Sequence, residues 1–405
     1  MAERNDVILV TVDSLRADRC GFMGYDGGTT PTLDRMAEDG LVFENAYAPA
    51  GATSGSASTF LTGSYPIDVP DAENRTEDIR HHLSARQTIP ELFDEMGYET
   101  AVFTANPWMS RYFMDPDVAD HFEDFMDSDM SRHVLESSRE SNSAVLSTAV
   151  RLMNWWQGQD MFMSWSAFYD DLKAWLDQAE SPYFAWIFLV DAHMPFLPRS
   201  EFRTQSRLLT YPANAWLYAQ RSVPFESKLQ DVLLEAYDNT IRDTDAFLER
   251  LDGDTDDPLL VVHADHGEEF GEHGNYGHGT LNDETLHVPL VVANGPNDTV
   301  TEPFQLRDMG SLLTTLAAGG DYRSVTSPVT YSRTFNSRAL HGQSWKFVRS
   351  GDDEELVRYD PGEPALTDGE LHSVASGLVD DWERADEERK QVQSAAAEVA
   401  TLESL

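Results

Sequence analysis

The segment from residue 262 to residue 289 holds the densest group of side chains that could do chemistry. In the sequence VHADHGEEFGEHGNYGHGTLNDETLHVP, an apolar run ends directly in Asp265 and His266. A carboxylate beside an imidazole is a suitable ligand pair for a divalent metal ion. An isolated Asp-His-Gly is as often a loop cap as a ligand, but His273 and His278 follow in the same glycine-rich stretch. The pattern therefore favours a metal site.

A second carboxylate, Asp13, follows the β-branched run Val7 to Val12, which is typical of a buried parallel strand. Alone, such an aspartate is more often a helix cap or a turn residue than a ligand. Ligand sites of open α/β sheets, however, lie at the carboxyl ends of strands. Asp13 and Asp265 are therefore expected to meet at one edge of a sheet.

The elements that would position these residues alternate along the chain. This alternation predicts an α/β fold with a mainly parallel central sheet, covered by helices on both faces. Near the C-terminus, Ser344 to Ser350 and Glu355 to Tyr359 read as a hairpin of a small antiparallel subdomain. Predicted helices are Pro31 to Asp39, Thr88 to Met96 and Ser227 to Leu251, and further predicted strands are Thr100 to Thr104, Phe184 to Val190, Leu259 to His263 and Val288 to Ala293.

The domain organisation follows from a change in the sequence pattern past residue 330. We expect a catalytic domain over residues 1–330, with a helical, Trp-rich insertion at about 126–180. Residues 331–405 would form a small α+β subdomain that ends in an acidic helix, expected from Asp380 to Leu405.

The composition is strongly acidic, with 71 Asp and Glu against 29 Lys and Arg and a net charge of −42. Molar salt shortens the screening length to roughly 3 Å, so we interpret the surface as adapted to a halophile's cytoplasm. A disordered acidic block is disfavoured because the acids are spread between apolar runs and aromatics make up 11% of residues. Such a surface argues against nucleic-acid and anionic-membrane partners, while a small anionic substrate stays possible.

Cysteine content and hydropathy bear on disulfide bonds, metal sites and cellular location. The single cysteine, Cys20, excludes an internal disulfide and any multi-cysteine metal site. The run Val7 to Val12 lacks a basic flank and is too short for a signal or a membrane span, so we expect a cytoplasmic protein with no integral membrane segment.

A set of ordered motifs resembles the sulfatase family of the alkaline phosphatase superfamily. It covers roughly residues 5 to 365, and its motifs in this order are far more specific than any one of them. The motifs are VILVTVDSLRAD from Val7, Leu61-Thr62-Gly63, Gly97 to Ala101, Asp191 to Phe196, Ala264 to Gly267 and LVRYDPGE from Leu356.

The resemblance places the nucleophile at Thr53. In sulfatases a Cys or Ser opens a Cys-x-Pro-Ser-Arg motif nine residues before the Thr of Leu-Thr-Gly, and counting back from Thr62 gives Thr53. Gly55 and Ala57 stand where the proline and the arginine would be, whereas Ser56 keeps the serine. A threonine is a secondary alcohol and cannot give the formylglycine aldehyde, so that cofactor is not expected. Thr nucleophiles occur in relatives that act on phosphoryl groups.

By resemblance, one divalent metal ion (Ca²⁺, Mn²⁺ or Zn²⁺) is held by Asp13, Asp265, His266 and Thr53. His193 and His278 would face the substrate, as catalytic and binding groups, together with Ser56. Around this set, Arg16, Glu268, Glu269 and His273 are candidate supporting residues.

The expected function is a metal-dependent hydrolase that cleaves a phosphate ester, a phosphodiester or a sulfate ester through a covalent Thr intermediate. Its substrate would be a small anionic ester, and glycan-linked and lipid-linked esters are both candidates. The alternatives are a catalytically inactive relative that binds a glycan or lipid head group, and a transferase of phosphoryl head groups.

Overall fold

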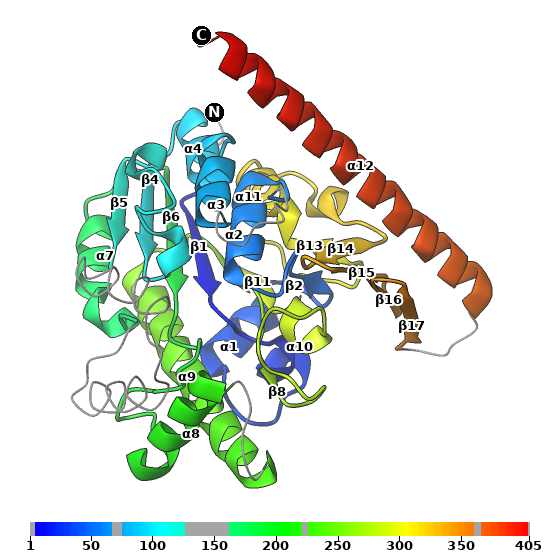
Figure 1. Cartoon of the computed structure of the whole chain (residues 1–405). Coiled ribbons are helices and arrows are strands. Elements are labelled where there is room, and N and C mark those ends of the chain that lie inside the picture. Colours follow the sequence, from blue (N-terminus) through cyan, green and yellow to red (C-terminus); the bar gives the residue numbers. More distant parts are fainter. Residues whose placement is uncertain (1–4, 67–74, 126–161, 221–225, 360–365, 404–405) are drawn as a thin grey trace.

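The computed structural model describes residues 5–66, 75–125, 162–220, 226–359 and 366–403, and its centre is an eight-stranded sheet (Figure 1). Strand β11 is antiparallel to its neighbours, and the other strands run parallel to one another. The mainly parallel sheet predicted from the sequence is therefore confirmed. In spatial order the strands are β12 (Asp298–Val300), β2 (Leu41–Phe43), β11 (Leu290–Ala293), β7 (Leu259–Ala264), β1 (Val7–Val12), β6 (Tyr183–Leu189), β4 (Glu99–Thr104) and β5 (His121–Asp124).

The three central strands, β1, β6 and β7, are buried and end in register. All residues of β1, β6 and β7 are buried, as expected for apolar strands covered on both faces. Their register aligns the last residues, because Val12 of β1 lies opposite Leu189 of β6 and Ala264 of β7. The residues that follow these strands therefore leave the sheet at the same edge, side by side.

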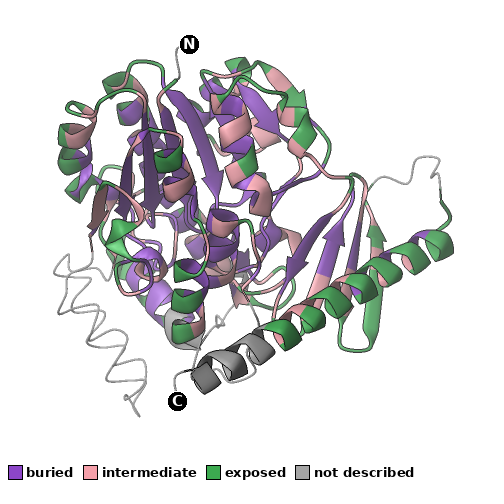
Figure 2. Ribbon diagram, turned by 90° about the horizontal axis from the view of Figure 1, so that it is seen from above, coloured by how far each residue is buried: buried purple, intermediate pink, exposed green. Residues whose placement is uncertain are grey.

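Helices cover both sides of this sheet (Figure 2). One group contains α1 (Pro31–Asp39), which packs on α9 (Glu226–Asp254), and α9 in turn contacts α8 (Arg207–Gln220). A second group contains α2 (Thr53–Thr62), which contacts α3 (Arg75–Ser84) and α11 (Met309–Ala317), and α11 also meets α4 (Ile89–Glu95). The expected helical cover of the sheet is confirmed.

Most predicted bounds hold to within a few residues, and the first of two exceptions lies at Pro289. The stretch Val288 to Ala293, predicted as one strand, is divided at Pro289, which has no N–H to donate. The first part, β10 (His287–Val288), joins a separate small sheet with β3 (Ala46–Tyr47) and β13 (Phe304–Gln305). Only β11 enters the central sheet.

The C-terminal region forms a four-stranded antiparallel sheet of β14 (Thr330–Arg333), β15 (Ser337–His341), β16 (Trp345–Ser350) and β17 (Asp353–Arg358). The long helix α12 (Asp368–Glu403) packs on this sheet through Ala375 and Val379, which are buried in a small apolar cluster. The antiparallel C-terminal sheet is thus confirmed, but the helix begins twelve residues earlier than Asp380.

A capping box explains this earlier start. The Thr367 N–H donates to Glu370 Oε2 at 2.9 Å, and the Glu370 N–H donates back to Thr367 Oγ1 at 3.4 Å. Ser/Thr followed three residues later by Glu is the signature of a helix N-terminus. The Thr-Asp-Gly-Glu stretch therefore carried the signal for a helix start before Asp380.

The predicted Trp-rich insertion lies largely outside the described residues. Its described end contains a 3-10 turn at Trp165–Ala167 and the helix α7 (Tyr169–Leu176). The Trp165 indole is buried against Tyr169 and Phe247. Trp165 is therefore part of the hydrophobic core.

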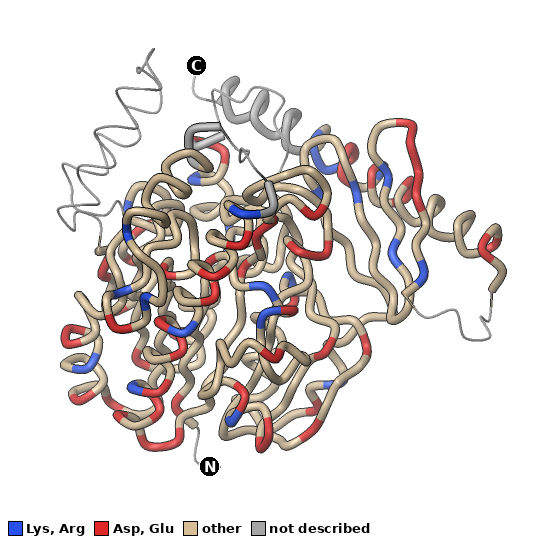
Figure 3. Tube along the Cα trace, turned by 90° about the horizontal axis from the view of Figure 1, so that it is seen from below, with Lys and Arg blue, Asp and Glu red and all other residues tan. Residues whose placement is uncertain are grey.

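Acidic residues are distributed over the whole described chain, between fewer basic ones (Figure 3). This distribution agrees with acids that are spread along the sequence instead of concentrated in one block. Among the described residues, none of the helices combines the length and apolar character needed to cross a membrane.

Candidate active site

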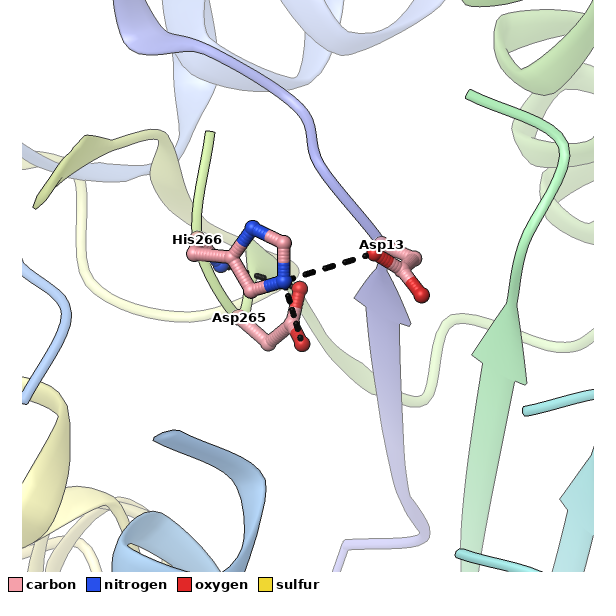
Figure 4. A group of neighbouring side chains, drawn as sticks. All are labelled: Asp13, Asp265 and His266. Carbon is pink, nitrogen blue, oxygen red and sulfur yellow. Dashed lines mark hydrogen bonds and ion pairs between the residues drawn. The ribbon is translucent and has the colours of Figure 1, made fainter. Parts of the chain in front are cut away.

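Asp13, Asp265 and His266 meet at the carboxyl edge of the central strands (Figure 4). His266 Nε2 lies 3.6 Å from Asp13 Oδ1 and 3.6 Å from Asp265 Oδ2. All three side chains are almost fully buried. The register of β1 and β7 produces this meeting, since Asp13 and Asp265 directly follow the paired residues Val12 and Ala264.

The chain turns sharply after Asp13. Ser14 has a φ of 63°, in the left-handed region that is costly for a residue with a side chain. Its neighbours hold this conformation: the Tyr237 hydroxyl donates to the Ser14 carbonyl at 2.6 Å, and the Ser14 N–H points to Asp265 Oδ1 at 3.4 Å. The turn is thus fixed by α9 and by the second carboxylate.

The two aspartates differ in their hydrogen bonds. Asp13 accepts from Asn106 Nδ2 at 2.7 Å and from Ser14 Oγ at 2.9 Å. Asp265 Oδ1 accepts from the His266 N–H at 2.9 Å, whereas Asp265 Oδ2 is buried with no hydrogen-bond partner among the described residues. A buried carboxylate oxygen without a donor is costly unless a cation meets it.

The tautomer of His266 is fixed by the backbone. Its Nδ1 lies 2.9 Å from the Gly267 carbonyl, which can only accept, so Nδ1 carries the hydrogen. The lone pair on Nε2 then faces the two carboxylates, as in metal-binding histidines. Burial, together with the nearby His278, lowers the pKa of His266 to about 4, so the ring is neutral at pH 7.

The electrostatics of the cluster also fit a cation. Burial and the Asp13 carboxylate raise the pKa of Asp265 well above its ordinary value. Two carboxylates and a neutral imidazole, all within 4.8 Å of one another, form a compact, electron-rich donor set. Asp13, Asp265 and His266 therefore suit a divalent metal ion.

Thr53 reaches this cluster from the other side. It is the first residue of α2, is 5% exposed, and its Oγ1 lies 3.1 Å from His266 Nε2. A helix N-terminus favours an anion, so developing negative charge near Thr53 is stabilised by α2. Close loop packing holds the segment: a Cβ on Gly51 would lie 2.2 Å from the Thr280 carbonyl oxygen.

Ser56 has a different role from the expected one. Its side chain is fully buried, and its hydroxyl donates to the Asp265 carbonyl at 2.6 Å. The hydroxyl therefore fastens α2 to the end of β7 and does not face the cleft as a substrate-binding group. Ala57, at the position where sulfatases carry arginine, is also fully buried.

His193 and His278 lie beside the cluster. The His278 ring centroid is 4.7 Å from that of His266 and 5.2 Å from that of His193. His278 Nδ1 lies 3.3 Å from Glu268 Oε2, and His193 Nδ1 bonds to the Met194 carbonyl. Burial alone would raise the pKa of Glu268, but the histidines, His278 first, lower it overall.

The remaining candidates divide into two groups. Arg16 stabilises the segment that contains Glu268. Its guanidinium donates to the Glu268 carbonyl at 3.0 Å and forms an ion pair with Glu272 at 2.6 Å. Glu269 and His273 do not reach the catalytic cluster and belong to a separate group with Glu284.

Asn106 was missed at the level of sequence. It follows β4 by two residues, and its buried amide donates to Asp13. Its place just after the carboxyl end of β4 was the available signal. The sequence did not predict the strand order, in which only β6 separates β4 from β1.

The family model named Sulfatase matches residues 5–301. Human iduronate 2-sulfatase is 35% identical over 95 residues, which cover 24% of this chain and 17% of that enzyme. The chain therefore aligns with less than a fifth of this relative's length.

Two solved structures share the fold over most of the chain. The phosphonate monoester hydrolase of Agrobacterium radiobacter has a TM-score of 0.63 at 17% identity, over 94% of this chain and 95% of that one. The soluble domain of lipooligosaccharide phosphoethanolamine transferase A from Neisseria meningitidis has a TM-score of 0.52 at 15% identity, over 78% and 88%. These likenesses show the fold alone.

Proposed function

Because the chain belongs to the sulfatase family, we propose that it is a metal-dependent hydrolase of phosphate esters or phosphodiesters that uses Thr53 as its nucleophile. The observation that carries this proposal is the position of Thr53 Oγ1, 3.1 Å from His266 Nε2 and beside two buried carboxylates. An unactivated threonine hydroxyl is a poor nucleophile at neutral pH and needs such surroundings.

Asp13, Asp265, His266 and Thr53 would hold the ion. The chemistry that it supplies is charge neutralisation, which favours the deprotonated form of a nearby hydroxyl and stabilises negative charge on the transferred group. The imidazole among the ligands makes Zn²⁺ or Mn²⁺ as suitable as Ca²⁺.

The residues of the chain then perform a two-step transfer. Thr53 Oγ1 forms a bond to the central atom of the ester as the bond to the leaving oxygen breaks. His193 or His278 supplies the proton that the leaving oxygen needs, and with Nδ1 engaged on each ring, Nε2 is the nitrogen that can exchange it. Water then attacks the same central atom and gives its proton to the histidine that protonated the leaving oxygen, while the bond to Thr53 Oγ1 breaks and Thr53 leaves as the alkoxide.

The nature of Thr53 favours phosphorus over sulfur as the central atom. A threonine cannot become the aldehyde whose hydrate eliminates sulfate, so the covalent ester must be resolved by a second attack at the central atom. Phosphoryl esters undergo such in-line displacement readily with charge stabilisation. If an alcohol replaces water in the second step, the same site acts as a head-group transferase.

The test is a substrate panel of an aryl phosphate, a phosphodiester and an aryl sulfate, assayed at high KCl with Zn²⁺, Mn²⁺ and Ca²⁺. We expect turnover of phosphoryl esters, abolished by Thr53→Ala. The matched control is Thr59→Ala in the same helix, because among the described residues the Thr59 hydroxyl bonds only to the Gly55 carbonyl of α2, at 2.6 Å.

Turnover that survives Thr53→Ala would refute the nucleophile assignment. Faster turnover of the sulfate ester would refute the preference for phosphorus. No turnover of any ester with any of the three ions would favour the inactive relative, which binds a glycan or lipid head group.

A further inference from the structure

We propose a second metal site, built by Glu269, His273 and Glu284 and suited to a divalent transition metal such as Zn²⁺, which fastens the loop that carries His278. Each of these residues offers a ligand atom, and the three atoms lie within 4.8 Å of one another. The inference does not depend on Thr53 being the nucleophile.

The group is separate from the catalytic cluster because of strand geometry. Glu268 and Glu269 are consecutive at the start of the hairpin of β8 (Glu269–Phe270) and β9 (Tyr276–Gly277). Successive side chains of an extended segment point to opposite sides. Glu268 accordingly faces His278, whereas Glu269 contacts Asn282, on the other side of the hairpin.

The observation that points to a ligand is the state of the Glu269 carboxylate. This side chain is 1% exposed, and its Oε1 accepts from Asn282 Nδ2 at 2.7 Å. Its Oε2 is buried without a hydrogen-bond partner within the described parts of the chain. A buried, half-satisfied carboxylate is costly, and a cation held between Glu269 and its neighbours would remove that cost.

The other two ligands complete the set. His273 Nε2 and Glu284 Oε2 are 3.0 Å apart, and Glu284 lies in the short helix α10 (Asp283–Leu286). The turn that brings His273 back uses Gly271 and Gly274, with φ of 102° and 77°, values that glycine adopts without strain. The His273 side chain is 49% exposed, which leaves room for water to complete the coordination.

Within the described part of the chain, no arginine takes the place of the ion. Arg16, which contacts this segment, is engaged by Asp18, Glu272 and the Glu268 carbonyl. Among the described residues, the only ion pair recorded for either Glu269 or Glu284 is the one with His273. The pair of carboxylates therefore keeps net negative charge.

The donor set selects the ion and suggests its role. Two carboxylates and an imidazole suit Zn²⁺ or Mn²⁺, whereas Ca²⁺ and Mg²⁺ prefer oxygen ligands alone. Two of the ligands come from the hairpin and one from α10, so a bound ion joins these two elements. His278 directly follows β9, and the ion would thereby hold the catalytic loop in place.

The experiment counts Zn²⁺ per chain. The full-length protein is stripped with a chelator and then dialysed against Zn²⁺ in molar KCl with excess Mg²⁺, which saturates non-specific carboxylates. Bound Zn²⁺ is measured by plasma mass spectrometry. We expect His273→Gln to bind one Zn²⁺ fewer than the wild type, and His81→Gln, a surface control on α3, to bind as many as the wild type.

The Asp265→Asn variant separates this site from the catalytic one. It should lose one Zn²⁺ on its own and two when combined with His273→Gln. In the Asp265→Asn background, Zn²⁺ should slow proteolysis and hydrogen exchange of residues 269–277, and the added His273→Gln should abolish that protection. An unchanged Zn²⁺ count in His273→Gln, or protection that survives this substitution, would overturn the proposal.

Discussion

The substitution Asp265→Asn should stabilise the metal-free protein while it weakens the metal-loaded one. Asp13 and Asp265 each place a carboxylate oxygen within 4.8 Å of the other in a fully buried position. Two unit charges at that distance repel by about 3.5 kcal/mol at an effective dielectric constant of about 20. For a chain of this length, that energy corresponds to a rise of about 4 °C in the unfolding midpoint.

The sign of the pH dependence follows from the raised pKa of Asp265. Burial and Asp13 favour its protonated form in the folded state. The folded state is therefore penalised at every pH above the ordinary carboxyl pKa of about 4, and the penalty grows as pH rises toward the folded-state pKa. The advantage of Asp265→Asn should be largest at neutral and alkaline pH and should shrink as the pH is lowered.

The assay is thermal unfolding in molar KCl, with chelator or with Zn²⁺, between pH 5.5 and pH 8. With Zn²⁺ the order should reverse, and the wild type should become the more stable protein. Asp124→Asn is the matched control, because Asp124 is also buried but accepts from the backbone N–H and the guanidinium of Arg111. That variant should lose about 1 kcal/mol of folding stability. If chelated Asp265→Asn is no more stable than the wild type, the cluster carries no uncompensated charge.

Three further predictions rest on individual contacts. Ser56→Ala removes the hydrogen bond to the Asp265 carbonyl and should lower the free energy of unfolding, measured with denaturant, by about 1 to 2 kcal/mol. An unchanged midpoint would refute the role of Ser56 in fastening α2 to β7. Glu268→Gln should lower kcat roughly 10- to 100-fold, because a bond to a charged group orients His278, and an unaffected kcat would contradict this. With a net charge of −42, the melting temperature of the wild type should rise steadily with KCl, since molar salt shortens the screening length to about 3 Å; a flat dependence would exclude salt adaptation of the surface.

The sequence was sufficient for the architecture because the central strands carry strong local signals. Val7 to Val12 is mostly apolar and β-branched, a pattern typical of a strand covered on both faces. Two strands of this kind that end in Asp13 and Asp265 were enough to predict that these residues meet. The exact ends of two elements were harder to predict from hydrophobic periodicity. Pro289 ends a strand because it has no N–H to donate, and Thr367 begins a helix through its capping bond with Glu370.

Parts of the site depend on tertiary placement and could not be predicted. Asn106 contacts Asp13 only because β4 lies two strands from β1. Ser56 was expected to face substrate, but the rotation of α2 turns its hydroxyl toward β7. The division of Glu268 and Glu269 between two clusters required the hairpin geometry.

The most direct test of the account is to trap the covalent intermediate. The protein is mixed with a phosphoryl ester that it turns over, quenched in acid during the first turnovers, digested and analysed by mass spectrometry. The account predicts that the peptide containing Thr53 gains the mass of one phosphoryl group, and that Thr53→Ala gains none. A phosphoryl group found on His193 or His278 instead, or one that persists in Thr53→Ala, would contradict the central claim that Thr53 is the nucleophile.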